Sequence, residues 1–548
     1  MATVLKKGSD MVSSISNAFR HAILPVALLA ITTFSLPAAA QSAADMESGT
    51  LKFVLSPEPP FLLTAINTTL QMGMVTSKVM EGLLYLDNDL KPQPLLAEKW
   101  DISPDGLTYT FKLRPNVKWH DGQPFTSADV SYTILEVLKK VHPRGRTALA
   151  KITSVETPDP LTAIIKLKQP APPMLAALAS SYESPMMPKH LFAGTDPATN
   201  PYISKPIGTG PFVFKEWKKG DFILLEKNPN YWQAGKPVLR RIVFRIINDA
   251  SARAASFETG EVHIGGLSPV PLTDMPRIAK NPALSVETRG YAYMSPYLLM
   301  ELNQRKPPLN DVRVRRAIAH AIDRDRMTQI VWMGYGKPAV SPIPSQVTAF
   351  HSTDLPKYEY SVVKANKLLD EAGLKPAANG MRFKMTHDLF PLGSDFQRTG
   401  EFIKQQLARV GIEVELRSQD LPTYLRRVFT DYEFDSTSGY YGAFADPTQG
   451  VQRLYWSQAI QKGVVFTNAT DYRSPEMDRI IEAAQDENDA TKRKALYLDM
   501  QRLAMTDLPV IPLMETRFIT LSSSKLKKHT ISADGVIGGN FADAHFEK

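Results

Sequence analysis

A loop rich in aromatic residues offers the clearest surface for contact with a small molecule. The segment Ser438–Gly450, SGYYGAFADPTQG, holds three aromatic residues and three glycines and has no charge before Asp446. Aromatic side chains supply flat apolar area, and tyrosine adds a hydroxyl that seeks a hydrogen-bond partner when it is buried. This composition predicts a ligand with apolar or planar surface and hydrogen-bonding groups. The alternative is that these aromatic residues pack in the core.

Local motifs for catalysis are absent from the sequence. It contains no Gly-x-Ser-x-Gly elbow, His-Glu-x-x-His pair or P-loop, and no cysteine for a thiolate nucleophile, a metal site or a disulfide. WHDG at 119–122 could hold an acid–base pair, but Asp-Gly is typical of a hairpin turn, which favours an exposed His120. IGTGPF at 207–212 is glycine-rich, but Pro211 lacks the amide hydrogen of an anion cradle. We therefore predict no catalytic residue, no metal and no cofactor. A triad assembled from distant residues would leave no such motif.

The N-terminus has the pattern of a secretory signal peptide. A basic leader (1–21) precedes an apolar run (22–36) and the small residues Ala38 and Ala40, which predicts cleavage before Gln41. The alternative, a membrane anchor, needs about 20 apolar residues, more than this run contains. We therefore expect an exported protein, in the periplasm of a Gram-negative cell.

Charge and composition limit the possible partners. The net charge is +8, and removing residues 1–40 leaves +6, with Lys and Arg scattered among acidic residues. No basic stripe marks a nucleic-acid surface, so we predict no nucleic-acid partner. With 548 residues, of which 43% are hydrophobic, the chain can build a large core over two or more domains. Met11 is an alternative start.

The first half of the chain is predicted to be rich in strands. A buried strand begins the segment 49–61, and the spacing of apolar residues predicts a helix over 75–87. Asp105-Gly106 predicts a hairpin. Thr126 and Asp129 form a capping box before a helix. Further strands are expected at 162–168, 222–228 and 240–247, with a helix at 249–259.

The second half alternates helices with strands. Asp311, Ser361 and Ser474 are expected N-caps, and Gly411 is expected to end a helix. The segments 412–416 and 434–441 are expected strands, and 423–429 an expected helix. This alternation predicts an α/β lobe with a mostly parallel sheet.

Several long runs together resemble the extracytoplasmic solute-binding proteins of peptide/nickel-type ABC importers. The matching runs are 96–130 (LAEKWDISPDGLTYTFKLRPNVKWHDGQPFTSADV), 207–237 (IGTGPFVFKEWKKGDFILLEKNPNYWQAGKP), 259–262 (TGEV), 307–327 (PPLNDVRVRRAIAHAIDRDRM) and 407–416 (LARVGIEVEL). They are spaced as in that family, which is called family 5 and includes dipeptide- and oligopeptide-binding proteins. The first two are long and specific.

The resemblance implies an α/β, two-lobed periplasmic-binding-protein fold, type II-like, with an additional subdomain inserted in lobe I. Lobe I would comprise 45–296 plus 514–548, and lobe II 297–513. Two crossover strands would form a hinge, near SPYLLMELN and PVIPLME. The lobes would close on a solute and deliver it to an ABC permease and ATPase complex. We expect a monomer.

The resemblance also places the aromatic loop at the family's ligand site. Matching Gly439 and Asp446-Pro447 to the dipeptide branch puts Ala443 where that branch has an aspartate for the ligand's amino group. A count without gaps in the alignment puts Phe390 at the position where the dipeptide branch has an arginine for the ligand's carboxylate. A buried ammonium without a counter-charge loses solvation that the site does not return.

The predicted ligand-binding residues are therefore Tyr440, Tyr441, Ala443, Phe444 and Phe390, and an unmodified dipeptide is not the expected ligand. Asp446 is expected to cap a turn with Pro447. His263 stands where the family usually has aspartate, and surface variation is the simplest interpretation.

Three functions remain open at this point. The first is a transport receptor for a peptide-like or other small organic solute. The second is a binding protein for signalling or peptide sensing. The third is a secreted hydrolase on a similar scaffold.

Overall fold

The computed structural model describes residues 38–547. The predicted signal peptide and the alternative start at Met11 lie outside this range, apart from residues 38–40, which begin helix α1 (Ala38–Glu47). Among residues 38–547, none of the helices combines the length and apolar character that a membrane span requires.

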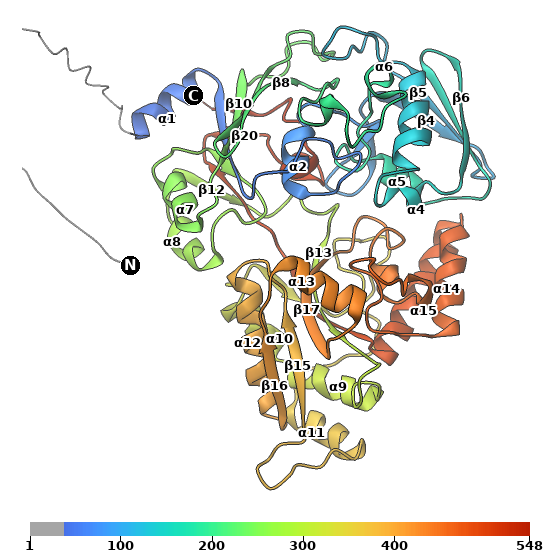
Figure 1. Ribbon diagram of the computed structural model, residues 1–548, viewed down its shortest axis with the longest axis vertical. Coiled ribbons are helices and arrows are strands. Elements are labelled where there is room, and N and C mark those ends of the chain that lie inside the picture. The colour runs from blue at the N-terminus through green and yellow to red at the C-terminus, as the bar shows by residue number, and fades with distance from the viewer. Residues whose placement is uncertain (1–37, 548) are drawn as a thin grey trace, which may run out of the picture. The chain divides into compact units, whose positions relative to one another are not determined.

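The first large sheet has seven strands, which include the strands expected at the start of 49–61, at 222–228 and at 240–247, whereas the strand expected at 162–168 belongs to another sheet (Figure 1). Its order is β12 (Leu284–Glu287), β19 (Thr520–Ser523), β11 (Ile264–Gly265), β1 (Thr50–Leu55), β10 (Arg241–Ile246), β9 (Phe222–Lys227) and β8 (Phe212–Lys218). β1 lies inside the sheet, paired in parallel with both β10 and β11. Leu51, Phe53 and Leu55 on one face of the strand are fully buried, and Val54 on the opposite face is buried as well, as expected for a strand that is covered on both faces. Helix α7 (Ala250–Glu258) confirms the helix expected after β10.

A four-stranded antiparallel sheet forms the inserted subdomain. Its order is β4 (Ala97–Ile102), β5 (Thr108–Leu113), β7 (Thr162–Leu167) and β6 (Ile152–Asp159). The predicted hairpin is confirmed, since β4 pairs with β5 across Asp105-Gly106 and Gly106 has a φ of +68°. The capping box of Thr126 and Asp129 is also confirmed, at the start of α3 (Ser127–Tyr132).

The second large sheet has six strands and is mixed, so the prediction of a mostly parallel sheet is wrong. Its order is β14 (Gly336–Pro338), β18 (Val510–Thr516), β13 (Pro296–Leu302), β17 (Ser436–Gly442), β15 (Phe383–Leu389) and β16 (Ile412–Arg417). β15 pairs in parallel with β16 and β17, whereas β13 is antiparallel to both its neighbours and β14 is antiparallel to β18. Parallel pairs need a crossover such as α12 (Ser394–Ala408), which joins β15 to β16. β13 and β18 are instead the strands at which the chain enters and leaves this sheet.

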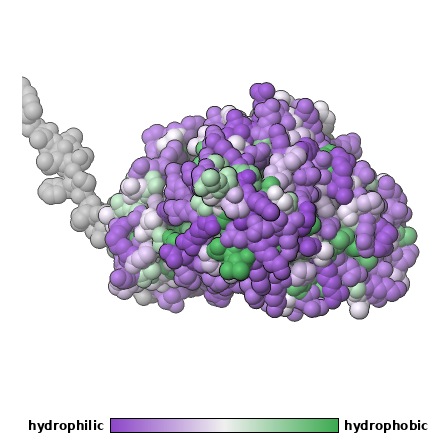
Figure 2. Space-filling view, turned by 90° about the horizontal axis from the view of Figure 1, so that it is seen from below, coloured by the Kyte–Doolittle hydropathy of each residue, from purple (hydrophilic) through white to green (hydrophobic). Residues whose placement is uncertain are grey.

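The expected helix starts in the second half are confirmed. The side chains of Asp311, Ser361 and Ser474 accept backbone N–H groups at the starts of α9 (Val312–Ala321), α11 (Val362–Glu371) and α14 (Pro475–Asp486). The other helices here are α10 (Arg324–Ile330), α13 (Leu421–Arg426) and α15 (Ala490–Asp507). Gly411 follows α12 with a φ of +77°. On the face seen in Figure 2, hydrophilic residues predominate and hydrophobic ones form small, separate patches.

The helix predicted over 75–87 is wrong. Helix α2 (Leu70–Thr76) ends near the start of that segment, and Leu84–Leu86 form strand β2, paired with β3 (Pro92–Pro94). The carbonyls of Lys78 and Val79 accept the amides of Phe212 and Gly210, at 3.0 and 2.9 Å. Long-range pairing with IGTGPF has replaced the helical hydrogen bonds of this stretch.

The IGTGPF segment is scaffold, and it explains why His120 is not exposed. A Cβ on Gly208 would lie 1.8 Å from the carbonyl oxygen of Val79, so only glycine fits this backbone contact. The half-buried His120 ring lies 2.9 Å, through Nε2, from the Gly210 carbonyl oxygen, and burial lowers its pKa to about 4. The WHDG turn itself forms as predicted, with Gly122 at a φ of +90°.

The interpretation of His263 as a surface variation is also wrong. His263 is fully buried, and its Nδ1 accepts the backbone amide of Lys52 in β1 at 3.0 Å. Nε2 lies 3.3 Å from the Ser42 hydroxyl in α1, and burial lowers the histidine pKa to about 4. A neutral imidazole here joins α1 to the first sheet, which an aspartate side chain with no N–H could not do in the same way.

Candidate functional site

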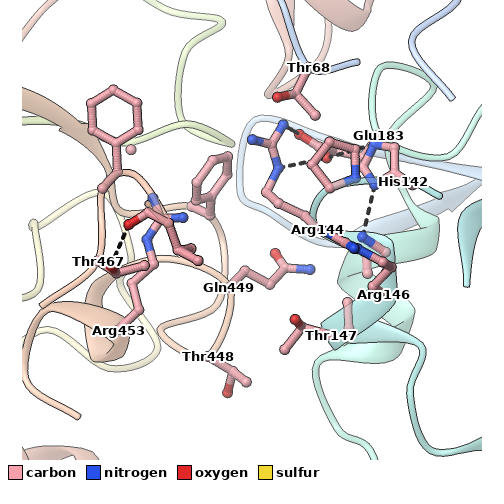
Figure 3. Close-up of a pocket in the computed structure, with 18 of the residues that line it drawn as sticks. Thr68, His142, Arg144, Arg146, Thr147, Glu183, Thr448, Gln449, Arg453 and Thr467 are labelled. Atoms are coloured by element: carbon pink, nitrogen blue, oxygen red, sulfur yellow. Dashed lines mark hydrogen bonds and ion pairs between the residues drawn. The ribbon is translucent and has the colours of Figure 1, made fainter. Parts of the chain in front are cut away.

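A cavity of about 660 Å³ lies between the lobe that contains the seven-stranded sheet and the lobe that contains the six-stranded sheet (Figure 3). One wall comes from helix α4 (Gly145–Ala148) and from 182–184 and 293–294. The other wall comes from the aromatic loop, the 3₁₀ helix η5 (Val451–Leu454) and the segment 456–467. Its size is that of a typical pocket for a small organic molecule.

Three of the five predicted ligand residues line this cavity. Tyr440 and Tyr441 come from the end of β17, and Phe444 follows with a φ of +58°. The Phe444 ring packs edge-on against Tyr293, with centroids 5.7 Å apart. The Tyr440 hydroxyl has a weak acceptor, the Met294 sulfur at 3.9 Å, so it is available to a ligand.

Tyr441 is tied to a buried acid behind the cavity. Its hydroxyl donates to Glu301 of β13, and both side chains are almost fully buried. Burial raises the pKa of Glu301 to about 7, although the bond from Tyr441 acts in the opposite direction. This bond fixes the ring of Tyr441 at the cavity wall.

Ala443 and Phe390 are placed elsewhere. Neither is among the residues that line the cavity. Ala443 is 2% exposed and belongs to a hydrophobic cluster behind the loop, and Phe390 packs edge-on against Phe396 and Tyr424. The strand β17 ends at Gly442 and the backbone turns at Phe444, whose φ is +58°, so the side chains of Ala443 and Phe444 point in different directions.

This placement changes the expected result of Ala443→Asp. We expect a loss of folding stability on the order of 3 kcal/mol, because a carboxylate in an apolar cluster must be desolvated or protonated. Urea unfolding of this variant checks it, with Ala445→Asp, at a half-exposed position in the same loop, as the milder control. Normal stability combined with lost ligand binding would instead place residue 443 at the ligand.

The aromatic loop has no charge before Asp446, but the lining of the cavity is charged. Its lining includes three arginines and one glutamate, Arg144, Arg146, Arg453 and Glu183, a net of two positive charges. The sequence prediction missed all four. Arg144, Arg146 and Glu183 lie far from the loop in the sequence and in no motif, whereas Arg453 lies three residues beyond Gly450.

Arg144 and Glu183 neutralise each other. The Arg144 guanidinium donates two hydrogen bonds to the carboxylate, that from Nε at 2.8 Å, and it also lies 5.0 Å from the centroid of the Phe444 ring. Burial alone would lower the pKa of Arg144, but the Glu183 charge outweighs it and the pKa is raised. Such a fork-to-fork pair is geometrically specific and uses both carboxylate oxygens. Glu183 is thus occupied before any ligand arrives.

His142 lies beside this pair as a neutral imidazole. Its Nδ1 accepts the backbone amide of Gly145 at 2.8 Å, and its buried Nε2, 3.7 Å from Glu183, has no hydrogen-bond partner among residues 38–547. Burial lowers the pKa of His142 to about 4, and the charge of Glu183 only partly opposes this. Since Nδ1 accepts a hydrogen bond, the single ring proton is on Nε2, which is therefore a donor without an acceptor in the described part of the chain.

The turn predicted at Asp446 is confirmed, and the residue has a second role. Oδ1 accepts the Thr448 amide at 2.9 Å, as in an Asx turn. Both carboxylate oxygens also accept hydrogen bonds from Arg493 of α15, at 2.7 and 2.8 Å, and both side chains are less than 9% exposed. This buried ion pair fixes the aromatic loop to the lobe.

A metal site is not evident in the described part of the chain. Within residues 38–547, no three His, Asp or Glu side chains lie close enough together to hold an ion.

Comparison with known proteins identifies the family. Residues 91–463, more than half of the chain, match the family model of the bacterial extracellular solute-binding proteins, family 5. The chain belongs to family 5 of the extracellular solute-binding proteins. It is the substrate-binding component of an ABC importer, and it works with the importer's permease and ATPase.

Relatives and solved structures are similar to the chain over most of its length. A putative ABC transporter peptide-binding protein of Brucella ovis is 33% identical over 83% of this chain and 84% of its own length. The glutathione-binding protein GsiB of Salmonella typhi is 29% identical over 87% and 90%. The periplasmic binding protein DppA of Helicobacter pylori, solved with the peptide STSA, is 26% identical, has a TM-score of 0.75 and covers 91% of this chain and 98% of its own. The two-lobed fold predicted from the sequence is thus confirmed.

Proposed function

We propose that the cavity between the lobes is the solute-binding site and that the lobes close on the solute before delivery to the permease. The observation that carries this proposal is the lining, which combines Arg144 and Glu183 of one lobe with Tyr440 and Phe444 of the other. We propose lobe boundaries at 45–296 plus 514–548, and at 297–513. The chain passes between the large sheets twice, from β12 to β13 and from β18 to β19, which gives a two-strand hinge.

Contacts between the lobes away from the cavity are consistent with closure. Lys151 of the inserted subdomain pairs with Asp486 at the end of α14, and it donates to the Gln485 carbonyl at 3.1 Å. Asn488 donates to the carbonyl of Asp105, in the β4–β5 hairpin, at 3.2 Å. These polar contacts can form and break without exposing apolar surface, as a hinge motion requires.

The solute is proposed to be peptide-like or another small organic molecule, as for the relatives that bind peptides or glutathione. A free α-amino group has no available carboxylate in the lining, because Glu183 is engaged by Arg144. We therefore still predict that unmodified dipeptides are poor ligands. The reason is now only that their free amino group would lack a partner in the cavity. Catalysis is no part of this proposal.

Closure predicts that solute binding changes both stability and dimensions. A solute that binds only the folded protein at 100 times its Kd should add about 2.7 kcal/mol to the free energy of unfolding. The radius of gyration should fall on binding. Small-angle scattering and thermal unfolding, with and without solute released from the purified protein, check this. Identical scattering with a saturating solute would contradict closure.

The mature protein is proposed to be a periplasmic monomer that begins at or near Gln41. Such a start removes part of α1 but keeps Ser42, which approaches His263. Intact-mass measurement of protein from a periplasmic extract should give the mass of residues 41–548. Periplasmic protein that retains residues 1–40 would contradict cleavage, and light scattering checks the monomer.

A further inference from the structure

Arg453, which is half-buried, differs from Arg144 and Arg493 because no residue of the described part of the chain pairs with it. Among residues 38–547, no hydrogen bond or ion pair to its guanidinium is formed, and its buried Nε lacks any acceptor. Arg144 and Arg493, by contrast, are both held by two carboxylate oxygens. In Figure 3 Arg453 lies beside Thr467, on the opposite side of the cavity from Arg144 and Glu183.

Holding an unpaired cation in this place costs folding free energy. Burial and the nearby charge of Arg144 lower the pKa of Arg453 to about 10, so the side chain still carries its charge at neutral pH. The charge of Glu183 opposes this lowering only in part, and both its carboxylate oxygens are already engaged by Arg144. Buried charges are normally paired, and an unpaired one in a cavity indicates that the partner is supplied from outside.

Groups near Arg453 narrow the chemistry of that partner. The buried side-chain oxygen of Gln449 receives no hydrogen bond from the described residues, and the Tyr440 hydroxyl has a weak acceptor. A ligand with an amide N–H would satisfy Gln449, and its apolar part would contact Tyr440 and Phe444. A guanidinium matches the planar fork of a carboxylate.

We propose that Arg453 binds the carboxylate of the transported solute, and that the solute is an organic acid whose nitrogen, where present, is acylated rather than a free amine. This inference rests on the proposed function of the cavity. It assigns the carboxylate to η5 in lobe II and not to residue 390, where Phe390 lies in a hydrophobic cluster.

Matched probes test the proposal by calorimetry. The panel is N-acetyl-phenylalanine, N-acetyl-Ala-Phe and phenylacetate, each beside its carboxamide, and Ala-Phe with a free amino group. The wild type should bind the acids at least about tenfold more tightly than the amides, since a hydrogen-bonded charge pair contributes on this scale. N-acetyl-Ala-Phe should bind more tightly than Ala-Phe.

Variants of Arg453 separate a ligand role from a structural one. Arg453→Gln should weaken acid binding about ten- to a hundredfold and abolish the preference over amides. Arg453→Lys should retain part of the preference, because it keeps the charge but loses the fork. Without ligand, Arg453→Gln should melt at the same temperature as the wild type or higher, since it removes an unpaired buried charge. Arg479→Gln, the same change at an exposed position on α14, should alter nothing.

Each outcome has a distinct meaning. An unchanged acid preference in Arg453→Gln would overturn the proposal, as would a wild type that binds none of the acids, because the carboxylate is common to them all. Thr147→Trp, which fills the cavity from α4, should abolish binding of every probe. If the acids bind Thr147→Trp as they bind wild type, the proposed function fails. If Thr147→Trp blocks them and Arg453→Gln does not, only this inference fails.

Discussion

Asp446→Asn is expected to lower the free energy of unfolding by about 3 to 5 kcal/mol, because it leaves Arg493 buried and unpaired. Asparagine can still accept the Thr448 amide, so the turn is preserved and the missing charge is what the variant tests. Solute affinity should also fall, because the Asp446–Arg493 pair fixes the loop that presents Tyr440 and Phe444 to the cavity. Equilibrium unfolding in urea gives the first quantity and calorimetry the second.

A double-mutant cycle isolates the pair. Arg493→Met alone should also be strongly destabilising, but Asp446→Asn with Arg493→Met should cost less than the sum of the two, since neither charge is then left unpaired. Asp354→Asn is the matched control, because Asp354 pairs with Arg502 at 2.7 Å on the surface and is 84% exposed. It should change little. Additive losses in the double variant would show that the two side chains do not act as a pair.

Acid is expected to destabilise the second sheet through His387. This residue of β15 is fully buried, and its two ring nitrogens lie 2.9 Å from the hydroxyls of Ser436 and Ser438 in β17. Burial lowers its pKa to about 3, so the folded protein binds this proton much less readily than the unfolded chain does. The neutral form of His387 contributes its full share to the free energy of unfolding above the unfolded pKa of about 6.5. This contribution is lost as the pH falls, and the loss is about 3 kcal/mol at pH 4.

His387→Gln isolates this contribution. Glutamine cannot titrate, so the loss of unfolding free energy between pH 7.5 and pH 4.5 should be smaller in the variant by about 2 to 3 kcal/mol. The variant keeps a residual pH dependence from other histidines whose pKa burial lowers to about 4: His120, His142, His263 and His529. Equal pH dependence of wild type and variant would show that His387 is protonated equally in the folded and unfolded states.

The elements that the sequence predicted well are those specified by neighbouring residues. The Asp105-Gly106 hairpin, the caps at Asp311, Ser361 and Ser474, and the Thr126 capping box depend on short-range backbone chemistry. The helix expected over 75–87 failed because its backbone carbonyls bond to residues 210–212 instead. The prediction of mostly parallel strands in the second sheet was wrong for a similar reason, because the path of the chain between the lobes places β13 and β18.

The cavity could be predicted only in part. Aromatic content identified Tyr440, Tyr441 and Phe444, but side-chain direction, which separates Ala443 from Phe444, depends on the local backbone. The pairing of Arg144 with Glu183 joins two loops 39 residues apart and leaves no spacing to detect. Arg453 could have been noticed from its position in the apolar run GVQRLYW, although its lack of a partner is visible only in three dimensions.

Native mass spectrometry of wild type and Thr147→Trp tests the central claim, solute capture in the cavity between the lobes, most directly. After incubation with the mixture of small molecules extracted from purified wild-type protein, wild type should retain a non-covalent organic adduct. Thr147→Trp should fold normally, since residue 147 is exposed on α4, and should retain none. The same adduct at the same occupancy on both proteins, or none on wild type, would contradict capture in this cavity.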